Sequence, residues 1–337
     1  MEVIDGVPHT AFPMDDASRV GEVRRHAARL SAQQDWGEVD AGRLALVVTE
    51  LATNLLRHAT GGRLLIAARA ERSEVELLAI DRGPGIPDLD RCLGDGYSTG
   101  STPGTGLGAV RRLSQQFDLH SSVPEGTIVL ARLRKAGGPA AVSSDFEVGA
   151  VCLPAPGETV SGDAWAACLQ EGRAALIVAD GLGHGPDAHK AARAALDVFS
   201  RRPFADLREG LREAHQELRT TRGAAVTILQ LDAMASRIRA TGAGNVLARI
   251  ISGVTDRTLL SQHGTVGVQI RSPDEVAYDW PAHAILVVYT DGIESRWDAR
   301  RLLPVLGRDP VMAAAILVRD HLRGRDDATV VVARRRA

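Results

Sequence analysis

The apolar residues of the first 135 positions recur first at helical spacing and then at strand spacing. A short strand is predicted at residues 7–12, and a helix at residues 17–34. A second helix follows Asp40, and its apolar stripe consists of Leu44, Val47, Val48, Leu51, Leu55 and Leu56. Two strands are then predicted at residues 63–70 and 75–80. A glycine-rich loop at 100–110, a helix at 109–117 and a last strand at 127–133 follow. This order predicts helices packed on one face of a mainly antiparallel sheet.

The segment at residues 136–145 is small, flexible in composition and poor in large apolar groups, so it is predicted to be a linker. Beyond it, strands rich in β-branched residues are predicted at 146–155, 173–181, 225–232, 236–244, 247–253, 284–292 and 328–335. Helices are predicted at 188–199, 204–219 and 310–323. A two-sheet sandwich flanked by helices fits this order, which makes the whole chain an α+β protein of two domains, 1–135 and 146–337.

Composition narrows the class of protein. The 337 residues are 45% hydrophobic and carry a formal net charge of −2, so no bulk attraction to nucleic acid or acidic membranes is expected. No segment approaches the roughly 20 apolar residues of a membrane helix, and the N-terminus lacks a signal-peptide pattern. Cys92, Cys152 and Cys168 form no C-x-x-C pair and are expected to be reduced thiols. Together these features predict a cytoplasmic protein.

Three patches of the first domain suit a nucleotide. Glu50, Asn54 and His58 lie four residues apart, so they share one helix face, where a carboxylate and an amide can hold hydrated Mg²⁺. Asp81 ends a strand before the glycines of DRGPGI, and a carboxylate there can accept a hydrogen bond from an exocyclic amine. The glycines of GSTPGTGLGAV precede a helix whose N-terminus attracts phosphate. Taken singly, each patch is equally a solvated helix face, an ordinary turn or a flexible loop.

In this order and spacing, the three patches resemble the N box and the two glycine boxes of the GHKL ATPases, which have the Bergerat α/β sandwich. The segment DRGPGIPDLDRCLGDGYSTG is closest to the anti-sigma-factor and switch-protein serine kinases of the RsbT-like branch, including the patch at residues 95–99. The resemblance implies ATP and Mg²⁺ as cofactors and phosphoryl transfer to a serine or threonine of a STAS-domain protein.

The resemblance also implies roles for individual residues. Glu50 would activate the attacking hydroxyl, Asn54 would bind Mg²⁺, Arg57 would contact phosphate and Asp81 would bind adenine. The glycine boxes would contribute Gly83, Gly85, Gly104, Thr105, Gly106, Leu107 and Gly108, the last five as the lid over ATP.

The second domain places aspartates at the ends of apolar strands. They occur in SGDAW, VADGLGHG, YTDGI and RDDATVVV, as Asp163, Asp180, Asp291, Asp326 and Asp327. Grouped and buried carboxylates are costly unless a cation neutralises them, and oxygen-only ligands suit Mg²⁺ or Mn²⁺. Two such ions about 4 Å apart can activate a water and bind a phosphate. The alternative is that these Asp-Gly pairs are only turns.

These blocks, with ATGAGN at residues 240–245, resemble the SpoIIE-type group of metal-dependent type 2C (PPM) serine/threonine phosphatases, with the compact length of the RsbX-like enzymes. The resemblance implies that Asp180 bridges two metal ions, that Gly181 adds its carbonyl, and that Asp291 and Asp326 complete one shell. Asp163 would support the second ion, and Asp327, where relatives often carry Asn, would support the ligands. His184 is either a proton donor, a phosphate contact or an ordinary loop histidine. The arginine that binds phosphate in eukaryotic relatives has no counterpart before Asp163.

Two readings of the whole chain follow. In the first, a bifunctional partner-switching regulator phosphorylates and dephosphorylates STAS-domain anti-sigma antagonists or stressosome-type proteins, and fusion raises the effective concentration of each module for the other. In the second, the chain is a serine/threonine phosphatase whose ATP-binding domain only senses nucleotide or docks partners. A non-catalytic scaffold is a third class, and a DNA-binding regulator lacks a basic recognition helix. The oligomeric state is left open, with a homodimer among the alternatives.

Overall fold

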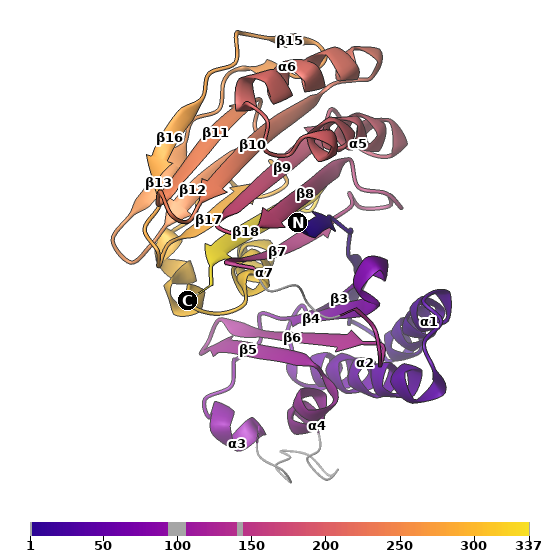
Figure 1. Ribbon diagram of the computed structural model, residues 1–337. Helices are drawn as coiled ribbons and strands as arrows, with labels where there is room; N and C mark the ends of the chain where they lie inside the picture. Colours follow the sequence, from indigo (N-terminus) through magenta and orange to yellow (C-terminus); the bar gives the residue numbers. More distant parts are fainter. Residues whose placement is uncertain (1, 94–105, 140–143, 337) are drawn as a thin grey trace. The chain divides into compact units, whose positions relative to one another are not determined.

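The computed structural model describes residues 2–93, 106–139 and 144–336. Contacts divide the chain into two compact units. The N-terminal unit is His9–Ala141, and the C-terminal unit is Val142–Ala337 together with Met1–Pro8. Each unit has its own sheets and core (Figure 1). No helix in the described part of the chain combines the length and apolar character of a membrane span.

The N-terminal unit is a five-stranded antiparallel sheet with helices on one face. In sheet order, its strands are β2 (Thr10–Pro13), β3 (Arg63–Arg69), β4 (Glu74–Ile80), β6 (Gly126–Arg134) and β5 (Gln116–Ser122). Its helices are α1 (Ser18–Gln33), α2 (Glu38–His58), the 3₁₀ turn η1 (Ala70–Arg72), α3 (Leu89–Leu93) and α4 (Gly106–Leu113). The apolar stripe of α2 packs with α1 and with alternate residues of β3 and β4 in one core. This arrangement confirms the predicted layer of helices on an antiparallel sheet.

The C-terminal unit is a sandwich of two antiparallel sheets. The six-stranded sheet has the order β1 (Glu2–Asp5), β8 (Asp163–Gln170), β9 (Arg173–Gly181), β10 (Ala224–Asp232), β11 (Arg237–Ala243) and β16 (Val276–Asp279). The five-stranded sheet has the order β13 (Asp256–Leu259), β12 (Leu247–Ile251), β17 (Ile285–Tyr289), β18 (Ala328–Arg335) and β7 (Phe146–Leu153). A small two-stranded sheet consists of β14 (Gly264–Thr265) and β15 (Gln269–Ile270).

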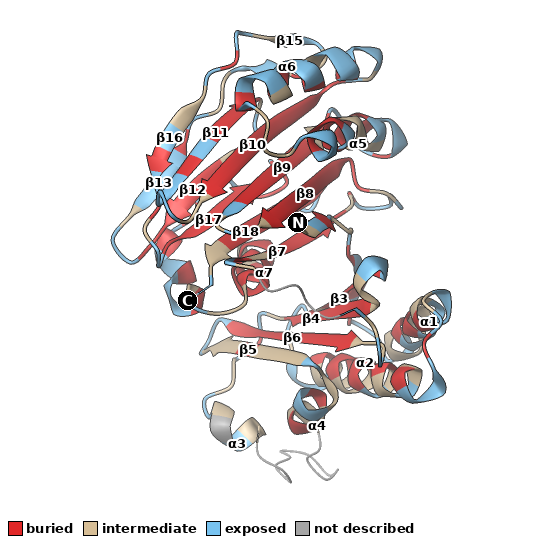
Figure 2. Cartoon of the chain, viewed as in Figure 1, coloured by how far each residue is buried: buried red, intermediate tan, exposed pale blue. Residues whose placement is uncertain are grey.

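Helices cover the outer faces of the sandwich. On the six-stranded sheet lie α5 (Pro186–Arg201), α6 (Leu207–Glu217) and the 3₁₀ turn η2 (Leu218–Thr220), and on the five-stranded sheet lie α7 (Pro310–His321) and the 3₁₀ helix η3 (Ala299–Val305). Residues such as Leu176, Leu229 and Leu286 fill the space between the sheets, and central strands such as β9, β10 and β17 are buried along most of their length (Figure 2). The predicted sandwich flanked by helices is therefore confirmed.

The N-terminus of the chain belongs to this sandwich. β1 pairs antiparallel with the edge of β8, Ile4 is buried in the core between the sheets, and Gly6 donates a backbone hydrogen bond of 2.8 Å to Trp165. Figure 1 accordingly shows the N-terminus beside β8. We expected residues 1–135 to form the first domain with a strand at 7–12. Instead, β1 ends before that segment, β2 overlaps only its last residues, and the first eight residues belong to the C-terminal unit.

Other elements differ from the expectation as well, among them α4 and β8. The helix predicted at 109–117 spans Gly106–Leu113 instead, the hydroxyl of Ser114 bonds to the Val110 carbonyl at its end, and the following residues form β5. β8 was not among the predicted strands. Its core sequence is rich in alanine, which has low strand propensity, yet its neighbours β1 and β9 and the buried faces on both sides hold it in the sheet.

Substitution of Gly6 tests the role of the N-terminal strand. A Cβ at this position would lie 2.5 Å from Cδ1, Nε1 and the carbonyl oxygen of Trp165. We expect Gly6→Ala to destabilise the C-terminal unit by about 1–3 kcal/mol, because the strand must shift to relieve the overlap. Urea unfolding followed by tryptophan fluorescence measures this. Gly253→Ala, at an exposed glycine with open space around its Cβ, is the matched control, and equal midpoints for the two variants would contradict the assignment.

Candidate functional site

The predicted aspartates lie at the ends of strands from both sheets of the C-terminal unit. Asp163 begins β8 and stands directly opposite Asp180, near the end of β9. Asp291 follows β17 after Thr290, while Asp326 and Asp327 precede β18, the neighbour of β17. The two sheets thus bring five carboxylates from four separated segments to one end of the sandwich.

Thr290 connects the two groups of strand ends. Its hydroxyl donates a 2.7 Å hydrogen bond to Oδ2 of the buried Asp163 and accepts a 2.9 Å bond from the Thr329 amide. Its own amide donates to the Thr329 carbonyl at 3.0 Å. One side chain therefore fixes the start of β8 against the β17–β18 pair.

The glycine of each Asp-Gly pair is required by close packing. A Cβ on Gly181 would overlap the backbone of Ala188 in α5, and a Cβ on Gly292 would overlap the carbonyl of Asp327. Neither position leaves room for a side chain, so a glycine is the residue that lets these backbones approach. The packing that brings the aspartates together thus explains the Asp-Gly pattern in the sequence.

Burial and mutual repulsion perturb the carboxyl groups. Burial, more than any other cause, raises the pKa of Asp163, and the charge of Asp327 raises it further. Burial also raises the pKa of Asp180, which is increased further by the charges of Asp163, Asp291 and Asp326. The pKa of Asp327 is raised by burial as well, although its Oδ1 accepts a 2.8 Å hydrogen bond from the Ala155 amide. Carboxylates that repel one another at neutral pH are a typical cation site.

Two buried carboxylate oxygens suit a cation. Oδ1 of Asp163 and Oδ2 of Asp327 have no hydrogen-bond partner in the described part of the chain, which is costly for a charged group. All donors in the cluster are oxygens, the ligand type of Mg²⁺ and Mn²⁺. Within residues 2–93, 106–139 and 144–336, no group of three or more His, Cys, Asp or Glu side chains is arranged so that it could hold a metal ion as it stands. A cation at this place is therefore supported by the two unpartnered oxygens and by the raised pKa values of Asp163, Asp180 and Asp327.

Asn245 is a member of the cluster to which the sequence gave no role. It follows β11 within the ATGAGN segment, and its Nδ2 donates a 2.7 Å hydrogen bond to Oδ2 of Asp291. This bond orients the carboxylate, which is otherwise exposed. The signal in the sequence was the position of Asn245 at the end of a strand, as for the aspartates.

His184 lies on the exposed loop between β9 and α5. Its Nδ1 is 2.6 Å from Oε1 of Glu158, and a Cβ on the neighbouring Gly185 would lie 3.0 Å from the same carboxylate. The histidine is therefore paired with a glutamate at the edge of the carboxylate cluster.

The N-terminal unit brings together two of its three predicted patches. Glu50 and Asn54 lie on α2, and a Cβ on Gly106, the first residue of α4, would lie 3.5 Å from Nδ2 of Asn54 and 3.7 Å from Oε2 of Glu50. The start of α4 thus faces the polar side of α2. Leu107 and Gly108 follow in the first turn of α4, while Gly104 and Thr105, with the patch at residues 95–99, lie outside the described residues.

The third patch surrounds Asp81. Oδ1 of Asp81 accepts a 2.6 Å hydrogen bond from the Gly83 amide, which shapes the turn after β4. Gly85 has φ of 75° and its Cβ position lies 2.6 Å from the Ser122 carbonyl, so glycine is required there. Arg57 is exposed in the last turn of α2. The helix is followed by Ala59, and a Cβ on Gly83 would lie 3.4 Å from the Cα of Ala59.

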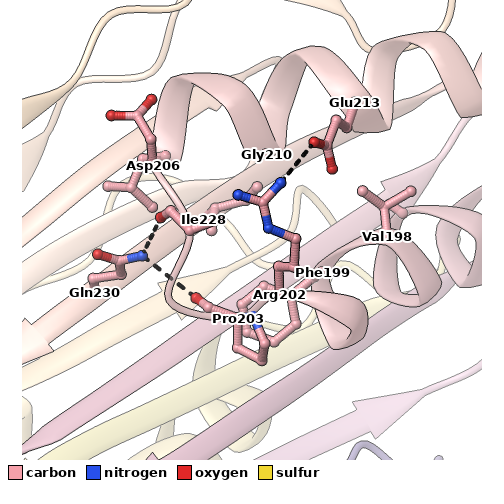
Figure 3. A pocket seen from close by; sticks show the side chains of 12 residues that line it. Val198, Phe199, Arg202, Pro203, Asp206, Gly210, Glu213, Ile228 and Gln230 are labelled. Carbon is pink, nitrogen blue, oxygen red and sulfur yellow. Dashed lines mark hydrogen bonds and ion pairs between the residues drawn. The ribbon is translucent and has the colours of Figure 1, made fainter.

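Two cavities lie away from the carboxylates. The first, of about 20 Å³, lies between α5, α6 and β10, and is lined by residues such as Phe199, Gly210 and Ile228 (Figure 3). Gln230 closes it by donating to the carbonyls of Pro203 and Ala205. It holds about one water and is a packing gap. The second, an open hollow of about 690 Å³, lies beside Tyr289 and Trp297. All three cysteines are free, as predicted.

Comparison with known proteins finds a different family for each half of the chain. A family model described as a histidine kinase-like ATPase domain matches residues 12–133, and one described as stage II sporulation protein E (SpoIIE) matches residues 170–336. Serine/threonine-protein kinase RsbT of Bacillus subtilis (strain 168) is 36% identical over 110 residues, which are 32% of this chain and 83% of that protein.

Two solved structures extend the comparison. One chain is 28% identical to this protein with a TM-score of 0.53. It comes from a study that describes the bacterial stressosome as a modular system adapted to control secondary messenger signalling. The match covers 56% of this chain and 99% of that one. The PP2C phosphatase domain of SpoIIE from Bacillus subtilis, with a fragment of its regulatory domain, has a TM-score of 0.50 at 15% identity. The match covers 94% of both chains and shows the fold alone.

The fold and the family matches thus define a protein made of a kinase-like ATPase domain and a SpoIIE-type domain with the fold of PP2C phosphatases. The N-terminal part of the chain belongs to the histidine kinase-like ATPase family as a homologue of RsbT, and the C-terminal part is a SpoIIE-type domain with the PP2C phosphatase fold. Both resemblances inferred from the sequence are confirmed.

The raised pKa values predict how stability depends on pH in the presence of EDTA. A carboxyl group with a raised folded-state pKa holds a proton that the unfolded chain releases, so stability falls as pH rises from about 4 through the raised pKa. We expect Asp180→Asn to remove part of this fall and to raise the melting temperature at pH 8 by several degrees. Thermal unfolding at pH 6 and pH 8 measures the effect. The control is Asp279→Asn, whose side chain is 89% exposed, and an Asp180→Asn variant that melts below wild type at pH 8 would contradict the repulsion.

Proposed function

We propose that the protein is a bifunctional partner-switching regulator that removes phosphate from, and transfers phosphate from ATP to, serine or threonine residues of STAS-domain proteins. The observation that carries the phosphatase half is the convergence of five mutually repelling carboxylates at the end of a PP2C-type sandwich. The carboxylate oxygens without partners on Asp163 and Asp327 support a cation at this place.

The residues that would hold two Mn²⁺ or Mg²⁺ ions are Asp163, Asp180, Asp291 and Asp326, with the carbonyl of Gly181. When bound, such ions would neutralise the phosphate charge and lower the pKa of the attacking water. Thr290 would hold Asp163 in place, Asn245 would orient Asp291, and Asp327 would fix the segment at Ala155. His184, paired with Glu158, would donate a proton to the leaving hydroxyl of serine or threonine or contact the phosphate, unless it is an ordinary loop histidine.

Support for the kinase half comes from the N-terminal unit. Glu50 would accept the proton of the attacking hydroxyl, Asn54 would hold Mg²⁺, and the start of α4 beside them would approach the phosphates of ATP. Asp81, Gly83 and Gly85 would bind the adenine end, and Arg57 would contact phosphate. The 36% identity to a serine/threonine kinase supports turnover in addition to binding.

The STAS-domain substrate class rests on the relatives. RsbT by name is a serine/threonine kinase, and a chain 28% identical to this one comes from the bacterial stressosome. A stressosome-type or anti-sigma antagonist protein is therefore the proposed phosphoprotein.

The phosphatase half is tested with phosphorylated STAS-domain proteins encoded beside the gene. We expect the substrate to lose about 80 Da (HPO₃) for each phosphate removed, and this loss to depend on Mn²⁺. Mass spectrometry measures the loss. Asp180→Asn should lower the rate at least about 100-fold, because the metal ions contribute several kcal/mol. Asp279→Asn is the control. Metal-independent hydrolysis, or an unchanged rate in Asp180→Asn, would refute the assignment.

The kinase half is tested separately with the unphosphorylated STAS-domain proteins, ATP and Mg²⁺. The Asp180→Asn variant serves as the parent protein, so that hydrolysis does not remove the transferred phosphate. Glu50→Gln should lower phosphate transfer by about 10²–10⁴-fold and leave ATP binding intact, because it removes a general base and keeps the shape of the side chain. Glu38→Gln, at an exposed glutamate in the first turn of the same helix, is the control. If the protein that retains Glu50 binds nucleotide but transfers no phosphate, a sensor or docking role for this domain is favoured instead.

A further inference from the structure

The carboxylate cluster gathers five acidic side chains at one end of the sandwich. In the described part of the chain, no ion pair joins a lysine or arginine to any of the five, which are Asp163, Asp180, Asp291, Asp326 and Asp327. A phosphate ester dianion would therefore be repelled unless a cation near the cluster attracts it.

Arg222 supplies a cation beside the loop that follows Asp180. It lies just before β10, and the backbone of the next residue, Gly223, accepts a 3.0 Å hydrogen bond from the Leu182 amide. A Cβ on Gly183 would lie 3.3 Å from Nη1 of Arg222. The guanidinium is therefore in contact range of the Gly181–Gly185 loop.

Gly183 also borders the carboxylates. A Cβ built on Gly162 would lie 3.3 Å from the Gly183 carbonyl oxygen and 2.6 Å from Oδ2 of Asp327, an oxygen without a hydrogen-bond partner in the described residues. Gly162 in turn accepts a 3.1 Å hydrogen bond from the Gly181 amide. The backbone of Gly183 thus lies between the guanidinium of Arg222 and the cluster.

A salt bridge holds Arg222 in this position. Its Nη2 donates a 2.7 Å bond to Oδ2 of Asp187, in the first turn of α5. The arginine side chain is 53% exposed, so its remaining N–H groups are open to a ligand. The 16-residue helix α5 begins at the same loop and adds the positive end of its dipole.

We propose that Arg222 binds the phosphate of the phosphoprotein substrate at the edge of the carboxylate cluster. This inference rests on the proposed phosphatase activity and assigns a residue for substrate recognition within it. A guanidinium offers N–H pairs that match two phosphate oxygens, and Asp187 orients it toward the Gly183 loop without using all of its donors.

Two other arginines lie on the segment next to Asp326, but the positions of their guanidinium groups are not held by contacts among the described residues. Arg323 and Arg325 are exposed on the segment before Asp326, and the amide of Arg323 donates to the Gly292 carbonyl. No contact in the described residues fixes either guanidinium. Arg222 is therefore the arginine that the geometry favours, and the other two serve as competing candidates in the test.

The experiment measures Mn²⁺-dependent hydrolysis of p-nitrophenyl phosphate by the full chain, with inorganic phosphate as competitive inhibitor. Arg222→Ala should raise both KM and the inhibition constant of phosphate about tenfold, with kcat changed less than about threefold, because the residue contributes uniform binding. Arg222→Lys should recover part of the loss. Mn²⁺ affinity by calorimetry and the melting temperature should stay at wild-type values. Arg219→Ala, at an exposed arginine three residues earlier whose partner is Gln216, is the matched control.

The outcomes separate this inference from the proposed function. Wild-type protein without Mn²⁺-dependent hydrolysis would overturn both. An active wild type with equal phosphate inhibition constants in Arg222→Ala and Arg219→Ala would overturn the role of Arg222 alone. A tenfold increase of the phosphate inhibition constant in Arg325→Ala or Arg323→Ala, with no increase in Arg222→Ala, would also overturn the role of Arg222. Phosphate binding would then be assigned to the segment before Asp326.

Discussion

The repulsion among carboxylates at one end of the sandwich is the constraint on which the rest of the C-terminal unit depends. Folding must bring Asp163, Asp180 and Asp327 together at a cost, since burial and mutual charge raise the pKa of each. That cost is met by the packing of the two sheets and their helices around apolar cores. The site thus stores electrostatic free energy that the proposed divalent cations would release on binding.

The details of packing around the cluster serve this constraint. Thr290 links β8 to β17 and β18 through one hydroxyl, so the two sheets cannot slide apart at the site without losing a buried hydrogen bond. Gly181 and Gly292 let α5 and the start of β18 approach within van der Waals contact. A side chain at either glycine would separate the aspartates from one another, so the spacing of the carboxylates is set by backbone packing.

The sequence predicted the layers of both units and the convergence of the strand-end aspartates, but it failed where local preference and tertiary context differ. The aliphatic stripe of α2 and the β-branched strands β10 and β18 have strong periodic signals, and they lie where expected. β8 was missed because Ala164, Ala166 and Ala167 have low strand propensity, and only its neighbours in the sheet make it a strand. Asn245 had only its position after a strand as a signal, and Arg222 had none. Their positions depend on which loops meet in space, which a single sequence does not encode locally.

The pairing of β1 with β8 changes how the two units are connected. The chain leaves the sandwich after Pro8 and returns to it at Val142, so the ATP-binding unit is covalently joined to the phosphatase fold at both of its ends. On one side, the joint is the short segment after Asp5, which hydrogen-bonds to Trp165, two residues from Asp163 in the same strand. A displacement of that segment would therefore act directly on the strand that begins with a carboxylate of the cluster. A chain of two domains in tandem, joined by one linker, would lack this connection, because its only joint would precede β7, an edge strand of the other sheet.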